Sequence, residues 1–175
     1  MNTNLRSFDN LIFINFKLTK LEQMNINKVK EFYKNPRAAS IEALKIVQKK
    51  RNWISQNAII AIAKFLDISS TDLEGVATFY SGIFRQPVGR YIIQYCNSVV
   101  CFTTGYKNVK KSLEKKLNIK PGQTTVDKKF TLLSTCCLGY CDQGPVISIN
   151  KKIYKKLNYS IIPLIIESYN DIKKN

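Results

Sequence analysis

The first half of the chain carries its hydrophobic residues at helical spacing. Between residues 18 and 85 they recur every three or four positions, as they do on one face of an α-helix. We expect four short helices here, with hydrophobic positions at Leu21, Val29 and Phe32, at Ile41, Leu44 and Val47, at Ile59, Ile62, Ala63 and Leu66, and at Val76 and Phe79. Short amphipathic helices joined by brief connections are typical of a helical bundle.

Polar residues mark the expected helix ends. Thr19 and Glu22 have the spacing of a capping box, in which each side chain accepts a hydrogen bond from the other residue's amide. Asn35-Pro36 should end the first helix and begin the second, because proline is tolerated at the first helical position. The caps that we expect for the third and fourth helices are Ser55 and the pair Ser69 and Asp72.

Beyond about residue 86 the pattern becomes one of short β-rich runs separated by turn residues. It predicts the order β-α-β-β-β-α, with strands at 91–95, 130–135, 145–149 and 153–154 and helices at 105–117 and 160–172. Asn150-Lys151 should form a hairpin turn, and Pro163 must lie in or near the first turn of the last helix. A right-handed crossover makes the first two strands parallel and adjacent.

These patterns together predict an α/β (α+β) protein with an N-terminal helical bundle, followed by a domain of thioredoxin-like topology. In that domain a small mixed sheet has helices packed against it. We divide the chain into an N-terminal extension at 1–17, the bundle at 18–85 and the thioredoxin-like domain at 86–175.

Four of the five cysteines form two close pairs, Cys96 with Cys101 in CNSVVC and Cys137 with Cys141 in CLGYC. Each pair follows a predicted strand, and the carboxyl ends of neighbouring parallel strands meet at one edge of a sheet. Two pairs of thiolates at such an edge indicate a metal site. Their spacing leaves both a 2Fe–2S cluster and a structural zinc ion open, and either Cys136 or Cys137 could pair with Cys141.

The chain contains no histidine, and this excludes several classes of protein. Cys₂His₂ zinc fingers, Cys–His proteases, Ser–His–Asp hydrolases and Rieske centres all require imidazole. None of the seven glycines forms a G-x-G-x-x-G or Walker loop, so no dinucleotide site is expected in this chain.

The formal net charge is +16, from 28 Lys and Arg against 12 Asp and Glu. The basic residues are spread along the chain among many Asn and Ile residues, and no nucleic-acid-binding motif accompanies them. We therefore expect no nucleic-acid partner, although an acidic protein partner remains open. No apolar run is long enough for membrane insertion. The odd cysteine count and the absence of an export signal predict a cytoplasmic protein.

Residues 33–145 resemble the small, NuoE-type iron–sulfur subunit of the NADH dehydrogenase module of respiratory complex I, an NADH:quinone oxidoreductase. The matching stretches are NPRAASIEALKIVQ, GVATFYSGIFRQPVGRY, CNSVVCFTTGY, LNIKPGQTT and CCLGYCDQGP. The resemblance implies a thioredoxin-like ferredoxin domain with one 2Fe–2S cluster. Its ligands would be Cys96, Cys101, Cys137 and Cys141, which leaves Cys136 as a neighbour.

The resemblance also implies partners. The cluster would exchange electrons with FMN in a flavoprotein subunit that binds NADH, and a larger iron–sulfur subunit would complete the module. The assembly would be the peripheral arm of a membrane-bound complex on the cytoplasmic face of the inner membrane, and this chain alone would lack a complete active site. The alternatives are the equivalent subunit of an NAD-linked hydrogenase or formate dehydrogenase, and a zinc-stabilised interaction module.

Overall fold

The computed structural model describes residues 16–170. The chain divides at Pro87 and Val88 into two compact units, which we describe separately. The N-terminal extension expected at 1–17 lies outside the described residues, apart from its last two positions.

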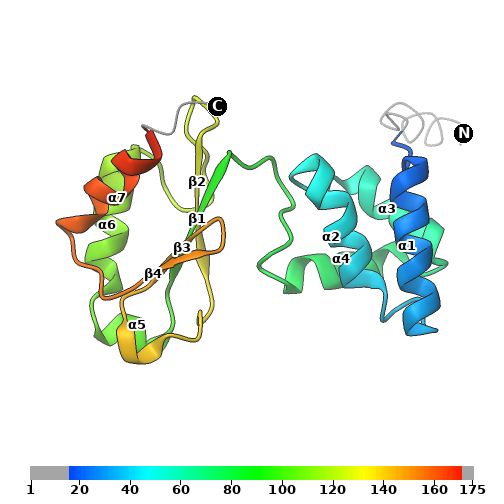
Figure 1. The fold of residues 1–175 in the computed structure, drawn as a ribbon, viewed down its shortest axis with the longest axis horizontal. Helices are drawn as coiled ribbons and strands as arrows, with labels where there is room; N and C mark the ends of the chain where they lie inside the picture. Colours follow the sequence, from blue (N-terminus) through cyan, green and yellow to red (C-terminus); the bar gives the residue numbers. More distant parts are fainter. Residues whose placement is uncertain (1–15, 171–175) are drawn as a thin grey trace, which may run out of the picture. The chain divides into compact units, whose positions relative to one another are not determined.

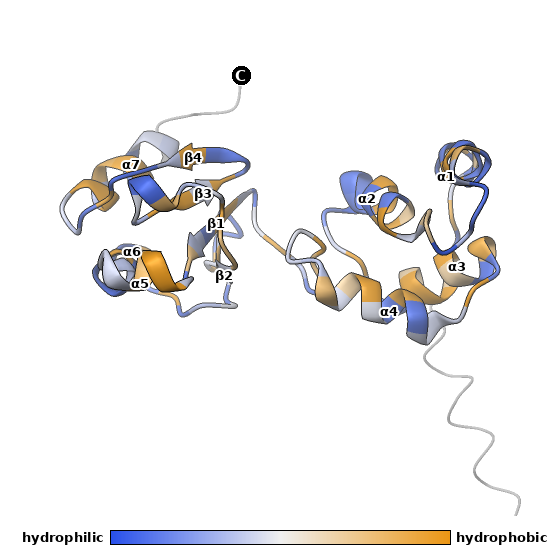
Figure 2. Cartoon of the chain, turned by 90° about the horizontal axis from the view of Figure 1, so that it is seen from below, coloured by the Kyte–Doolittle hydropathy of each residue, from blue (hydrophilic) through white to orange (hydrophobic). Residues whose placement is uncertain are grey.

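The first unit contains the four expected helices (Figure 1): α1 Lys20–Tyr33, α2 Ser40–Arg51, α3 Gln56–Leu66 and α4 Ser70–Phe79. Their inward faces form one hydrophobic core. Its largest fully buried side chains are Ile26, Leu44, Ile54, Ile59, Ile62, Leu66 and Leu73. Much of α3 is coloured as hydrophobic in Figure 2, and three of its isoleucine and leucine side chains belong to this core.

The capping box of α1 is confirmed: the Thr19 amide donates to Glu22 Oε2 at 2.7 Å, and the Glu22 amide donates to Thr19 Oγ1 at 3.3 Å. The predicted inward face of α1 is partly wrong, because Leu21 and Phe32 are 60% and 78% exposed. The inward face passes instead through Glu22 and Ile26, four residues apart. Leu21 and Phe32 share a side of the helix that is turned away from this face.

The expected start of α2 at Pro36 is also wrong. The Asn35 side chain accepts a hydrogen bond from the Arg37 amide at 2.9 Å and holds the chain in a turn, so α2 begins only at Ser40. The Ser55 cap on α3 is confirmed, since its hydroxyl accepts from the Ala58 amide. Before α4, Ser69 accepts from the Thr71 amide, and Asp72 pairs with Arg37 rather than completing a capping box.

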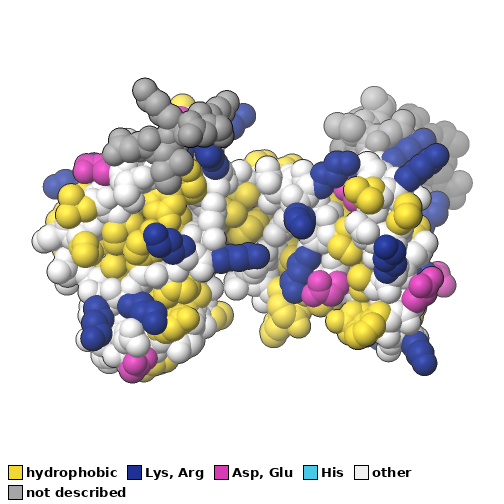
Figure 3. All heavy atoms as spheres, in the orientation of Figure 1, with side chains coloured by type: hydrophobic (Ala, Val, Ile, Leu, Met, Phe, Trp, Pro, Cys, Tyr) yellow, Lys and Arg dark blue, Asp and Glu magenta, His cyan; other side chains and the backbone are white. Residues whose placement is uncertain are grey.

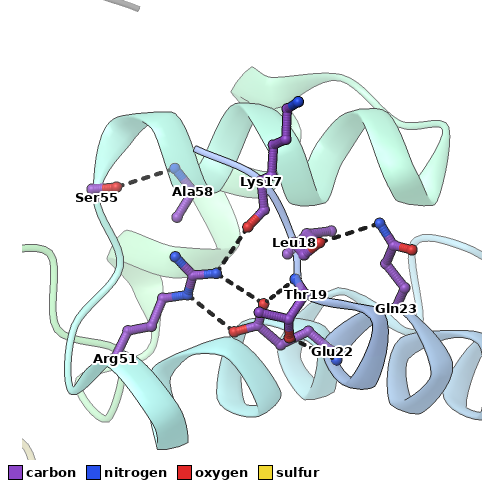
Figure 4. A network of polar contacts seen from close by, with 8 residues as sticks. All are labelled: Lys17, Leu18, Thr19, Glu22, Gln23, Arg51, Ser55 and Ala58. Atoms are coloured by element: carbon purple, nitrogen blue, oxygen red, sulfur yellow. Dashed lines mark hydrogen bonds and ion pairs between the residues drawn. The ribbon is translucent and has the colours of Figure 1, made fainter. Parts of the chain in front are cut away.

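A nearly buried ion pair joins α1 to the end of α2 (Figure 4). Arg51 donates from Nε to Glu22 Oε1 at 3.0 Å and from Nη2 to Glu22 Oε2 at 2.9 Å, while Glu22 is only 3% exposed. Arg51 also donates to the Lys17 carbonyl and lies over the Phe16 ring. The hydrogen bond from Arg51 is the main reason that the pKa of Glu22 falls from 4.5 to about 2, against the effect of burial, which raises it.

The second unit has the predicted β-α-β-β-β-α order with two short additions (Figure 1). Its elements are β1 Tyr91–Cys96, α5 Val99–Thr103, α6 Tyr106–Leu117, β2 Phe130–Thr135, the 3₁₀ turn η1 Cys141–Gln143, β3 Ile147–Ile149, β4 Lys152–Tyr154 and α7 Ile161–Asn170. The sequence pattern did not predict α5 and η1. Pro163 lies in the first turn of α7, as expected.

The four strands form one mixed sheet in the order β2-β1-β3-β4. Strands β1 and β2 are parallel neighbours, as predicted, and β3 pairs antiparallel with both β1 and β4. Asn150 and Lys151, both at positive φ, form the predicted hairpin turn. Helices α6 and α7 lie side by side against the sheet and close its hydrophobic core (Figures 1 and 2). The predicted fold class is confirmed.

We expect removal of the Glu22 carboxylate to destabilise the first unit by about 3 kcal/mol at neutral pH, because it leaves the partly buried Arg51 without its partner. The pKa of Glu22 is lowered on folding, so its contribution is complete above about pH 4.5 and is lost as the pH falls toward about 2. Urea unfolding of wild type and Glu22→Gln, followed by the fluorescence of the single tryptophan, measures both effects.

Glu42→Gln is the matched control, because Glu42 pairs with Lys45 on the surface and should contribute less than about 1 kcal/mol. Equal free energies of unfolding for Glu22→Gln and wild type at pH 7 would contradict the stabilising role of the Glu22–Arg51 ion pair. A difference between them that is as large at pH 2 as at pH 7 would contradict the linkage to the Glu22 carboxyl.

Candidate metal centre

The two cysteine pairs lie at one edge of the sheet. Cys96 is the last residue of β1 and is in register with Thr135, the last residue of β2. Cys101 follows in α5, whereas Cys137 lies in the loop that leaves β2 and Cys141 begins η1. The parallel pairing of these two strands therefore places both loops together, as the sequence predicted.

Cys96 and Cys101 form the buried pair, since each is only 2% exposed. With Val146 they make a small hydrophobic cluster, against which Tyr106, Leu138, Tyr140 and Ile153 pack. Val146 contacts both cysteines: its carbonyl accepts from the Cys96 amide at 3.1 Å, and its amide donates to the Cys101 sulfur. The buried pair is thus anchored to the segment that enters β3.

The pKa values of the two thiols of this pair shift in opposite directions, although burial raises both. Burial raises the pKa of Cys96, but hydrogen bonds with the Ser98 hydroxyl and amide, the Cys101 thiol and the Leu138 amide outweigh it and leave the pKa below its usual value. Burial, followed by the bond to Cys96, raises the pKa of Cys101 to about 11. The surroundings therefore favour a thiolate at Cys96, the form that binds metals.

Cys137 and Cys141 form the exposed pair. Their sulfur atoms lie 3.2 Å apart, and the hydrogen bond with Cys137, together with its charge, raises the pKa of Cys141. The Gly139 amide donates to Cys137 Sγ at 3.3 Å. Gly139 has a φ of +84°, in the left-handed region that glycine adopts without strain, so the tight loop needs a glycine here.

Gly144 brings the loops of the two pairs into contact. A Cβ atom on this residue would lie 2.7 Å from Thr104 Oγ1 and 3.4 Å from Cys101 Sγ, which leaves no room for a larger side chain. Thr104 is itself held by its hydrogen bond to the Val100 carbonyl in α5. The close approach at Gly144 keeps the segment after Cys141 against the buried pair.

The structure brings the four predicted ligands together as two pairs. Within residues 16–170 no three Cys, His, Asp or Glu side chains gather closely enough to hold one ion. In a 2Fe–2S cluster each iron takes two protein thiolates, so a pairwise arrangement matches this group. Amides that donate to sulfur, from Leu138, Gly139 and Val146, suit its negative charge. The donor set fits the cluster.

Cys136 is exposed at the end of β2, and it is Cys137 whose sulfur lies against Cys141. The sequence pattern missed the sulfur-binding amides and Lys155, whose ammonium group lies 3.8 Å from the centre of the Tyr140 ring. A backbone amide leaves no signature in a sequence, and Lys155 is only one of many lysines. These contacts depend on how the loops fold over the sheet edge.

The surface beside the buried pair is apolar. On α5, which appears hydrophobic in Figure 2, Val99 is 78% exposed and Phe102 is 52% exposed. Lys107 lies over the Phe102 ring at 4.6 Å. On the face that Figure 3 shows, Lys and Arg side chains are scattered rather than gathered into one patch, which agrees with their even spread along the chain.

Comparison with known proteins identifies the family. The model of the thioredoxin-like [2Fe-2S] ferredoxins matches residues 26–170. The E subunit of the NADH-quinone oxidoreductase of Buchnera aphidicola (subspecies Acyrthosiphon pisum) is 59% identical over 158 residues, which are 90% of this chain and 98% of that protein. The protein of the same name from Salmonella typhimurium is 57% identical over 154 residues, covering 88% and 93% of the two chains.

Among solved structures, an NAD⁺-reducing [NiFe]-hydrogenase in its H₂-reduced state matches with a TM-score of 0.62 at 25% identity. The match covers 75% of this chain but only 23% of the hydrogenase chain. The family match resolves the choice between metals in favour of one 2Fe–2S cluster. The chain belongs to the thioredoxin-like [2Fe–2S] ferredoxins and, within them, to the group of the E subunits of NADH-quinone oxidoreductases.

Proposed function

We propose that Cys96, Cys101, Cys137 and Cys141 hold the 2Fe–2S cluster, and that the chain is the electron-transfer subunit of an NADH:quinone oxidoreductase. The single observation that carries the proposal is the pairing of four thiols at one sheet edge, in a chain whose relatives are subunits of that enzyme. The bound cluster supplies one-electron oxidation and reduction.

The two cysteine pairs differ in their exposure to solvent, and we assign them different roles. Cys96 and Cys101 are buried among hydrophobic side chains, which limits the access of water to their side of the site. Cys137 and Cys141 are exposed, which favours electron exchange with a second protein because it shortens the path through this one. The amide donors stabilise negative charge on the sulfur atoms.

The partner that we propose is a flavoprotein subunit that carries FMN and binds NADH. The apolar surface of α5, with Val99 and Phe102, lies beside the cysteines and supports a protein contact at this place. A larger iron–sulfur subunit would complete the module, on the cytoplasmic face of the membrane. None of the helices within residues 16–170 is long and apolar enough to span a bilayer.

A second candidate is the corresponding part of an NAD-linked hydrogenase, because such an enzyme has a matching structure. Its identity of 25% is well below the 59% and 57% of the two quinone oxidoreductase subunits. We therefore favour the quinone oxidoreductase.

For the ligand set, we expect Cys137→Ser to lose most of the wild-type iron and acid-labile sulfide, together with the native visible and EPR signals, because it removes a thiolate from the exposed pair. Cys136→Ser is the matched control, since it changes the adjacent exposed thiol and should keep the full signal. Both variants are purified without oxygen and analysed for iron, sulfide and zinc.

Equal losses in the two serine variants would overturn the assignment of Cys137 over Cys136. A colourless wild-type protein with one zinc ion and no sulfide would overturn the proposed electron-transfer function itself.

For the partner, we expect NADH to bleach the visible absorption of the cluster only when the FMN-containing flavoprotein subunit is present. The isolated chain has no nucleotide-binding loop and should stay oxidised. Rapid mixing with stoichiometric flavoprotein subunit measures the rate, and the same subunit stripped of FMN is the control. Reduction by NADH at the same rate without the flavoprotein would contradict the proposed route.

A further inference from the structure

A lysine from outside the cysteine loops lies over the loop of the exposed pair. The Lys155 ammonium group is 3.8 Å from the centre of the Tyr140 ring, close enough for a cation–π contact. Tyr140 directly precedes Cys141 in the chain. The contact therefore brings a positive charge to a segment that carries two of the proposed cluster ligands.

The backbone around Lys155 is attached to the same loop. The Lys156 amide donates to the Gln143 carbonyl at 2.8 Å, and the Leu157 amide donates to the Pro145 carbonyl at 3.2 Å. Strand β4 ends one residue earlier, at Tyr154, and Leu157 is only 6% exposed. The main chain on both sides of Lys155 is thus fixed, even though its side chain is exposed.

Tyr140 in turn connects the two cysteine pairs. Its side chain packs against the small cluster of Cys96, Cys101 and Val146, whereas its backbone belongs to the exposed loop. The residue over which Lys155 lies therefore belongs to the loop of the exposed pair and also packs against the cluster of the buried pair. The sequence separates Lys155 from Tyr140 by fifteen residues, so the contact joins the end of β4 to the loop of the exposed pair.

One carboxylate balances this charge within the same loop. Asp142 follows Cys141 directly in the chain and accepts a hydrogen bond from the Gln143 side chain at 2.9 Å. Beside its two proposed ligands the loop thus carries the Asp142 carboxylate, and the Lys155 ammonium group lies over its Tyr140 ring. Variants of these two residues should act with opposite signs.

We propose that Lys155 sets the reduction potential of the cluster, holding a positive charge over Tyr140 that favours the reduced form. This inference rests on the ligand set proposed above. Reduction adds one negative charge to a cluster that is already negative, so a nearby cation stabilises the reduced form more than the oxidised form. A nearby carboxylate has the opposite effect.

The test uses the full chain, purified without oxygen, with the midpoint potential taken from an EPR-monitored redox titration. Lys155→Met should shift the midpoint potential to a more negative value. Lys155→Arg keeps the positive charge and can lie over the ring, so its midpoint potential should stay near that of wild type. Lys152→Met is the matched control, because Lys152 lies over Tyr154 outside the cysteine loops and should leave the potential near wild type. Asp142→Asn should shift the potential to a more positive value.

Several results would overturn the inference. One is an unchanged potential in Lys155→Met with a full cluster, and another is an equal shift in Lys152→Met and Lys155→Met. A third is a shift in Lys155→Arg as large as that in Lys155→Met. A fourth is a shift in Asp142→Asn in the same direction as in Lys155→Met. Iron, sulfide and the EPR line shape are measured on the same samples. Absence of the 2Fe–2S signal from wild type would instead be a failure of the proposed function, so the two failures are distinguishable.

Discussion

The metal centre depends on the parallel pairing of β1 with β2. This pairing aligns Cys96 with Thr135, so that the chain leaves both strands at the same edge of the sheet. Two loops that are about forty residues apart in sequence then lie together, and each presents two thiols. A slip of one residue in the register would turn the side chain of Cys96 to the other face of the sheet, away from the hydrophobic cluster that it forms with Cys101 and Val146.

The centre is asymmetric, and this asymmetry agrees with the electron-transfer function that we propose. One pair of cysteines is buried and held by backbone amides, while the other is exposed on a tight loop. Buried surroundings disfavour added negative charge, whereas amide donors favour it. Fixed charges nearby also act on this balance, and for this reason the inference above concerns the positions of Lys155 and Asp142.

Much of the fold was predictable because local signals agree with the tertiary structure. Helix caps such as Thr19 and Ser55, and the β-rich runs that became β1 and β2, lie where the sequence placed them. The errors have local causes: the Asn35 side chain holds a turn that delays α2, and the five residues of α5 are too few to show a helical period. On α1 the outward Leu21 and Phe32 were predicted to face inward, since hydrophobicity alone does not distinguish two apolar sides of one helix.

The sequence by itself determined the chemistry of the centre: two cysteine pairs, no histidine, and strands that end where each pair begins. These are properties of residue type and spacing, and they are enough to exclude every class of site that requires imidazole. Only the tertiary structure decided which pair is buried, that the sulfur of Cys137 and not that of Cys136 lies against Cys141, and that Lys155 lies over Tyr140. Those features depend on how the loops pack over the sheet and over each other, which no local pattern of residues determines.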